Sequence, residues 1–169
     1  MGRAFRTAGL GAVVLLVLAG AAGCTPAQDK LVAVRLDGGR IVLDPGRCPN
    51  ERTSRAYLAV YAKGGAADAQ PEQQWSADAD GSADQPAAVA VAAPPTGWRV
   101  SGTAPAEVRP DRRYYVSIDN VHDGNLLHTG VLDVDGAVLA GLAPDQVVAS
   151  KGGVMTAEAY RAKVGKSCG

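Results

Sequence analysis

Short runs of alternating apolar and polar positions fill most of the chain after residue 30. Alternation with a period of two places apolar side chains on one face of a β-strand. Turn residues, mainly glycine, proline and aspartate, separate these runs. Short strands divided by such turns predict an all-β sandwich. The predicted strands and hairpins occupy residues 30–48, 55–62, 73–77, 88–93, 97–101, 113–119 and 126–134.

The first predicted element is a hairpin over residues 30–48, in which a short Asp-Gly-Gly loop connects two apolar runs. Residues 55–62 are ambiguous, because Tyr57 and Tyr61 share one face of either a strand or a helix. The strict alternation of this run favours a strand.

The chain ends in a predicted helix over residues 157–164. Thr156 precedes it as a typical N-cap, and Gly165 follows it where a glycine commonly ends a helix. Met155 and Tyr160 have the spacing of a hydrophobic staple. We therefore expect Tyr160 to pack against the sheet.

The longest apolar run precedes the predicted domain. Arg3 and Arg6 lie before an uncharged stretch over residues 7–23, whose apolar centre is residues 12–19. This is the profile of a secretory signal peptide. A membrane-spanning helix requires about 20 apolar residues. The alternative is an uncleaved membrane anchor, which is disfavoured because this run is too short.

Residues 21–24, "AAGC", resemble the lipobox of bacterial lipoproteins, in which small residues precede a cysteine. In that family the cysteine receives a diacylglycerol and becomes the new N-terminus, so the resemblance implies lipidation of Cys24. Ala21 stands where leucine is usual, and an ordinary secretory cleavage after Ala21 is the alternative. The implied organisation is a signal peptide at residues 1–23, a tether at residues 24–29 and a single domain at residues 30–169.

Cys48 and Cys168 are the two cysteines that remain if Cys24 is acylated. An even pair in an oxidising compartment predicts a disulfide. Because this bond would close almost the whole domain into one loop, the loop-entropy model assigns it about 4–5 kcal/mol. A metal-binding or catalytic cysteine pair is the alternative, but neither cysteine has a nearby histidine or second cysteine.

Removal of residues 1–23 leaves 146 residues with 15 basic and 17 acidic side chains. This length suffices for one domain with its own core. The charge balance does not favour nucleic acid, which selects basic surfaces. With no phenylalanine left, the core depends on Val, Leu and Ala. Trp75 and Trp98 are predicted in that core, with an exposed groove for carbohydrate or peptide as the alternative.

The segment "DADGSAD", residues 78–84, contains oxygen ligands at Asp78 and Asp80, as at the start of a calcium loop. The later ligands of that loop are absent, which favours a solvated turn. The sequence also lacks the G-x-S-x-G, S-x-x-K, Walker and G-x-G-x-x-G motifs. We therefore expect neither an enzyme nor a cofactor.

Residues 119–128, "DNVHDGNLLH", contain both histidines of the chain. His122 and His128, with Asp119 or Asp123, are the candidate ligands of a divalent metal, because imidazole and carboxylate together suit zinc or copper. The Asp-Gly dipeptide inside this segment is also typical of a hairpin turn. The hairpin interpretation is preferred, and no resident metal is predicted.

Residues 97–102, "GWRVSG", and residues 107–119, "EVRPDRRYYVSID", resemble the middle and late strands of immunoglobulin-like and fibronectin type III-like sandwiches, where a proline-containing corner leads into a tyrosine-bearing strand. The alternation in the second segment predicts that Tyr114, Val116 and Ile118 point inward. With the lipobox-like start, the cysteine placement, "WRVSG" and "KVGKSC", the chain is also similar to small actinobacterial lipoproteins of uncharacterised function. That resemblance implies no activity.

These features predict a lipid-anchored, extracytoplasmic, non-catalytic module on the cell membrane. Its expected partners are the membrane, through the lipid on Cys24, and an envelope protein or small ligand. The oligomeric state is not predicted. A metal-binding lipoprotein using His122 and His128 is the alternative function, and an extracytoplasmic enzyme of unrecognised type is a further one.

Overall fold

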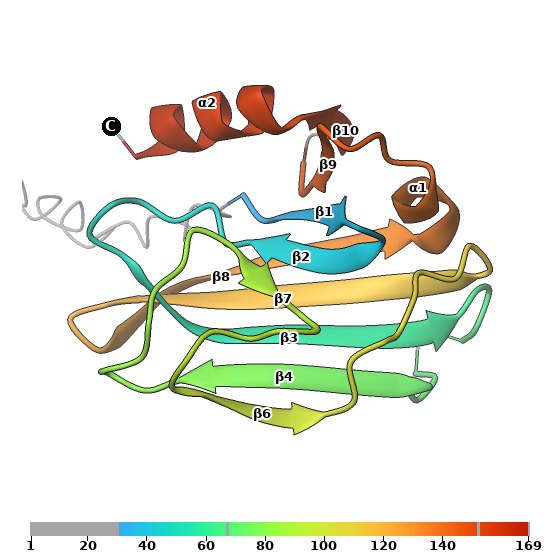
Figure 1. Ribbon diagram of the computed structural model, residues 1–169, viewed down its shortest axis with the longest axis horizontal. Coiled ribbons are helices and arrows are strands. Elements are labelled where there is room, and N and C mark those ends of the chain that lie inside the picture. The colour runs from blue at the N-terminus through green and yellow to red at the C-terminus, as the bar shows by residue number, and fades with distance from the viewer. Residues whose placement is uncertain (1–30, 67, 152, 169) are drawn as a thin grey trace, which may run out of the picture.

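The computed structural model describes residues 31–66, 68–151 and 153–168, and it confirms the predicted β-sandwich (Figure 1). Two antiparallel five-stranded sheets share one interior, and a helix follows at the C-terminal end. Within these ranges, no helix has the length and apolarity needed to cross a membrane.

The two sheets are called the β1 sheet and the β7 sheet. The β1 sheet has the order β10-β9-β1-β2-β5, with β1 (Ala33–Asp37), β2 (Arg40–Asp44), β5 (Val89–Ala90), β9 (Gln146–Ala149) and β10 (Gly153–Thr156). The β7 sheet has the order β6-β4-β3-β7-β8, with β3 (Arg52–Ala62), β4 (Gln73–Ala79), β6 (Trp98–Gly102), β7 (Arg112–His122) and β8 (Asn125–Asp135). Helix α1 (Gly136–Ala140) follows β8, and helix α2 (Ala157–Ser167) follows β10.

Several predicted strands are confirmed. Strands β1 and β2 form the first predicted hairpin, in which Gly38 and Gly39 have φ angles of +56° and +78°. Two successive positive φ angles are what a type I′ turn requires. Residues 55–62 lie in β3, which pairs with β4 on one side and β7 on the other.

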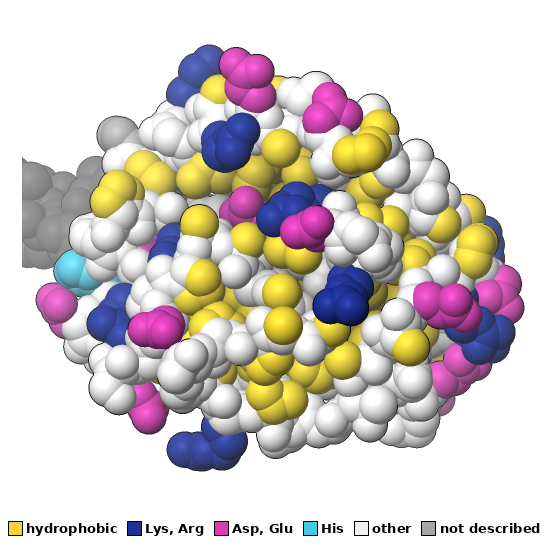
Figure 2. Space-filling view, in the orientation of Figure 1, with side chains coloured by type: hydrophobic (Ala, Val, Ile, Leu, Met, Phe, Trp, Pro, Cys, Tyr) yellow, Lys and Arg dark blue, Asp and Glu magenta, His cyan; other side chains and the backbone are white. Residues whose placement is uncertain are grey.

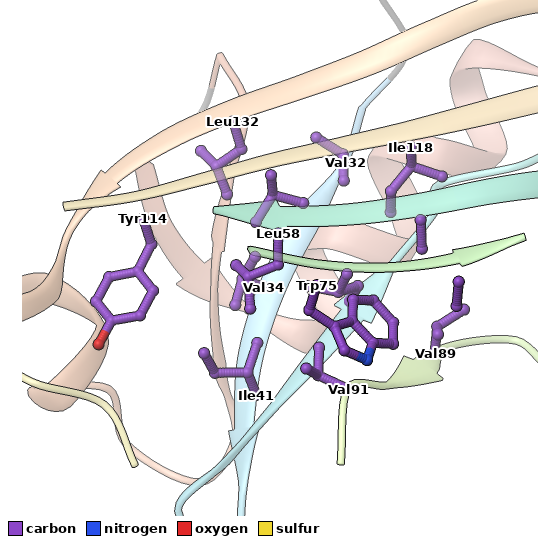
Figure 3. Close-up of a cluster of buried hydrophobic side chains, with 14 of the residues drawn as sticks. Val32, Val34, Ile41, Leu58, Trp75, Val89, Val91, Tyr114, Ile118 and Leu132 are labelled. Atoms are coloured by element: carbon purple, nitrogen blue, oxygen red, sulfur yellow. The ribbon is translucent and has the colours of Figure 1, made fainter. Parts of the chain in front are cut away.

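The interior is built from the inward faces of both sheets, as Figure 3 shows. Leu58 of β3 and Val116 of β7 pair directly with one another and are almost completely buried. Val34 and Ile41 contribute from the β1 sheet. The predicted inward positions Tyr114, Val116 and Ile118 are each at most 1% exposed. Burial of this apolar surface is the main term that stabilises the sandwich.

Helix α2 covers the outer face of the β1 sheet (Figure 1). Tyr160 packs there with Ala33 of β1 and with Val147 and Ala149 of β9. Thr156 caps the helix, and its hydroxyl accepts from the backbone N–H of Ala159 at 3.2 Å. The predicted cap and the packing of Tyr160 are therefore confirmed.

Other predicted boundaries are wrong. The strand predicted over residues 88–93 is only two residues long, because a turn closed by the Ala93 N–H donating to the Ala90 carbonyl at 3.2 Å ends it. Helix α2 does not end at Gly165 but continues to Ser167, with Cys168 as its C-cap. The hairpin of β9 and β10 was not predicted.

The β7 sheet has the order C″-C′-C-F-G of an immunoglobulin-like sheet if β3 and β7 take the places of strands C and F. Tyr114, near the start of β7, accepts the backbone N–H of Arg109 at 2.7 Å through its hydroxyl. This contact reproduces the tyrosine corner of such domains. Two features depart from that pattern: β5 precedes β6 in the chain, and the disulfide does not join the sheets.

Replacing Tyr114 with phenylalanine removes the acceptor of the Arg109 N–H at this corner. We expect the free energy of unfolding in urea to fall by about 1–3 kcal/mol, because a partly buried donor loses its partner. Tyr115→Phe is the matched control, since its side chain lies on the outer face, and it should change stability by less than about 0.5 kcal/mol. Equal losses in both variants would contradict the corner's role.

Candidate functional site

The structure contains the predicted disulfide between Cys48 and Cys168, with 5.5 Å between the Cα atoms. It joins the loop between β2 and β3 to the end of α2. Cys48 is buried and Cys168 is partly buried. The cross-link therefore holds α2 on the β1 sheet. Cys24, the predicted lipidation site, lies outside the described residues, as do the signal peptide and the tether.

A buried polar cluster, formed by Glu51, Thr53, Asn120 and His128, lies beside the disulfide. The Thr53 hydroxyl donates to Oδ1 of Asn120 at 2.9 Å. Nδ2 of Asn120 donates to the Pro45 carbonyl at 3.1 Å and lies 3.1 Å from Nε2 of His128.

Glu51 links the polar cluster to the disulfide. Its Oε2 accepts the backbone N–H of Cys48 at 2.8 Å and lies 3.8 Å from Nε2 of His128. Buried polar groups are tolerated when they are hydrogen-bonded to one another. The polar cluster thus fixes the β2–β3 loop against β7 and β8. The sequence identified His128 as a candidate site residue. It did not identify Glu51 and Thr53, because their contacts with His128 and Asn120 form only after distant strands have paired.

The two histidines that were the candidate metal ligands do not converge. His122 is exposed, with Nδ1 3.1 Å from the Asn50 carbonyl and Nε2 3.3 Å from Oδ2 of Asp123. His128 is buried against Glu51. Among the described residues, no group of three or more His, Cys, Asp and Glu side chains is arranged to hold a metal ion. The hairpin interpretation is confirmed, since Asp123 lies in the turn between β7 and β8.

The predicted solvated turn over residues 78–84 is confirmed only in part, because Asp78 and Ala79 end strand β4 and the exposed turn follows at residues 80–82. Oδ1 of Asp80 accepts from the backbone N–H of Ser82 at 2.9 Å and from its hydroxyl at 2.7 Å. These bonds to Ser82 lower the pKa of Asp80. Asp78 instead pairs with Arg55 of the neighbouring strand at 3.5 Å. The first two candidate calcium ligands therefore have separate structural partners.

The two tryptophans lie in the core, so the groove alternative is wrong. Trp75 is 2% exposed and Trp98 is 8% exposed. The indole N–H of Trp98 donates to the Asp84 carbonyl at 2.8 Å. This bond satisfies the polar atom of a ring whose remaining surface is buried.

A surface cavity of ≈ 590 Å³ opens beside the disulfide, between α2 and the β2–β3 loop. Several of its polar side chains make structural contacts. Arg47 donates to the Gln85 side chain at 2.7 Å and to the Gln85 and Pro86 carbonyls at 2.6 and 2.9 Å. Oδ1 of Asp44 accepts the Gly46 N–H at 3.1 Å. These contacts hold neighbouring loops together.

The outer face of the β7 sheet carries a tyrosine face, which consists of Tyr57, Tyr61, Tyr115 and Val131. The strand register places these side chains opposite the core, because their neighbours Leu58 and Val116 point inward. The rings of Tyr57 and Tyr115 meet edge to face, with centroids 6.3 Å apart. Val131 is 44% exposed.

Charged side chains surround the tyrosine face. The Arg113 guanidinium lies 5.2 Å from the ring centroid of Tyr61 and 3.7 Å from the Asp133 carboxylate. Burial raises the pKa of Tyr57. Between the rings, Ala59 is completely covered, although it lies on the outer face. The tyrosine face thus combines partly buried tyrosine rings with an arginine, and both residue types are enriched in binding surfaces.

Sequence reasoning recognised that Tyr57 and Tyr61 share a face, but it did not identify a site there. Tyr115 joins them only through the pairing of β3 with β7. Figure 2 shows one face of the molecule, where apolar side chains are interspersed with both signs of charge.

The chain matches no protein-family model, no curated protein and no solved structure.

Asp44 provides a test of the cavity's electrostatics. Burial raises its pKa above 3.8, so the folded state disfavours the ionised carboxylate. This contribution to stability is present below pH 3.8 and is lost as the pH rises through the raised pKa. Asp44→Asn keeps the acceptor for Gly46 and cannot ionise. We therefore expect the stability of the variant relative to the wild type to increase between pH 3 and pH 7, measured by urea unfolding at each pH.

The matched control is Asp37→Asn, at the exposed end of β1. Its relative stability should change less over the same pH range. A difference between wild type and Asp44→Asn that is constant with pH would contradict the burial argument.

Proposed function

We propose that this chain is a lipid-anchored, extracytoplasmic, non-catalytic binding module of the cell envelope. The observation that carries the proposal is the bond between Cys48 and Cys168. Disulfides of this kind persist in oxidising compartments outside the cytoplasm. With two of the three cysteines paired, Cys24 is left as the residue whose sulfur is available for acylation.

The tyrosine face supports the binding part of the proposal. Tyrosine and arginine contribute strongly to binding because each combines apolar area with hydrogen-bonding groups. Here three tyrosines and Arg113 lie together on one exposed sheet face. A tether on the N-terminal side leaves this face accessible to an envelope protein or a small ligand.

The anchor is tested by mass spectrometry of the membrane fraction. The mature protein should begin at Cys24 with added diacylglycerol mass, and the peptides containing Cys48 and Cys168 should be linked until reduction. Cys24→Ala should shift the protein away from the membrane fraction without changing its unfolding curve. A wild-type product that begins at Ala22 and carries no acyl group would contradict the proposal.

The binding surface is tested by hydroxyl-radical footprinting in intact envelopes and on the purified protein. Oxidation of Tyr57, Tyr61 and Tyr115 should be severalfold lower in the envelope, because a ligand covers them. Val138 and Val154 are the control sites, since both are exposed and lie off the tyrosine face. Equal oxidation of the tyrosines in both preparations would count against this surface.

A further inference from the structure

The tip of the β7–β8 hairpin projects beyond the sandwich. Side chains in β8 alternate between buried and exposed from His128 to Val134, but residues 122–127 are all exposed. Leu126 and Leu127 are 64% and 49% exposed, the two highest values among the large apolar side chains described. Both faces of the hairpin are therefore uncovered at this tip, and it presents two adjacent leucines to the surroundings.

The hairpin tip is built as a defined structure. Asp123 and Gly124 have φ angles of +49° and +79°, which suit a two-residue I′ turn. The register shifts between Asn120 and Val121, so Leu127 is the extra residue of a β-bulge. Bulges change the direction in which side chains point. Here the bulge ends the regular alternation and brings both leucines outside the core.

The hairpin tip lies at the end of the sandwich where the described chain begins. The Leu31 carbonyl accepts the Tyr160 hydroxyl at 3.2 Å and lies against Gly46. From Gly46 the β2–β3 loop runs to Asn50, whose carbonyl is 3.1 Å from Nδ1 of His122. Figure 1 shows the start of β1, this loop and the hairpin tip at the same end.

The length of chain before Leu31 then determines what faces this end. Six residues lie between Cys24 and Leu31, and the seven Cα-to-Cα steps from one to the other span at most about 25 Å when fully extended. If Cys24 carries the lipid, Leu31 is held within that distance of the bilayer. The opposite end of β3, an 11-residue strand, lies about 35 Å further along the strand direction.

We propose that the hairpin tip is a second membrane contact, in which Leu126 and Leu127 enter the interfacial region of the bilayer beside the lipid anchor. This inference rests on the proposed lipid attachment. Apolar side chains at a membrane surface gain from leaving water, and a second contact adds to an existing anchor. His122 and Asp123, paired at 3.3 Å, remain at the level of the lipid headgroups. The contact fixes the orientation of the domain, with the tyrosine face roughly perpendicular to the membrane.

The test uses the full, lipidated protein in phosphatidylcholine vesicles, with a thiol-reactive NBD fluorophore at Leu126→Cys. Ala66→Cys, in the exposed loop after β3 at the opposite end, is the matched control. Emission from the Leu126 label should shift to the blue and be quenched by a spin label carried on the lipid. The Ala66 label should show neither change.

A second variant separates insertion from mere proximity. With NBD at Asn125→Cys, replacing Leu126 and Leu127 with serine should abolish the quenching while the protein still floats with the vesicles. Quenching at Leu126 no greater than at Ala66, in protein that floats, would overturn the inference. Energy transfer between labelled copies without lipid quenching would also overturn it, because a second copy would then cover the tip.

Failure of the lipid proposal has a different signature. The chain without an introduced cysteine should not react with the fluorophore, because Cys24 is acylated and the other two cysteines are paired. If that chain reacts and does not float with vesicles, the anchor itself is refuted, and the inference about the hairpin tip is refuted with it.

Discussion

Strands β1 and β9 are buried on both faces where they pair with each other, and the helix α2 and the second sheet cover these two faces. In β1, Val34 enters the interior while Ala33 lies beneath α2. In β9, Val148 enters the interior while Val147 and Ala149 lie beneath α2. Without α2, the outer apolar face of these strands would be exposed to water. The helix is therefore an integral layer of the fold.

Burial of Tyr160 beneath α2 also brings hydrogen-bonding groups together at the end of the domain where β1 begins. The hydroxyl of Tyr160, buried beneath α2, needs acceptors and finds the Leu31 and Asp44 carbonyls at 3.2 and 3.3 Å. Its burial raises the pKa of the phenol, so the hydroxyl stays a donor. The adjacent disulfide and polar cluster then hold the loop that follows β2. The disulfide, the hydrogen bonds of Tyr160 and the polar cluster thus lie at the end nearest the proposed anchor.

Sequence reasoning was most successful where one face of a strand is buried and the other exposed. Alternation identified β3 and β7 and the inward direction of Tyr114, Val116 and Ile118. It missed β9, because Val147, Val148 and Ala149 are all buried and give no alternation. It also missed the polar cluster and the tyrosine face, since Glu51 meets His128, and Tyr57 meets Tyr115, only after distant strands have paired. The disulfide was predictable, because cysteine parity does not depend on the fold.

The position of the disulfide has a consequence for limited proteolysis. A cut in any exposed loop between Cys48 and Cys168 would leave two fragments that remain covalently joined through this bond. If Cys24 carries the lipid, both fragments would stay anchored. A cut before Cys48, among residues 25–30 or in the exposed turn at Gly38 and Gly39, falls outside the closed loop and would separate the anchor from everything after the cut. The same bond thus makes the domain tolerant of nicking after Cys48 and leaves covalent attachment dependent on the segment before it.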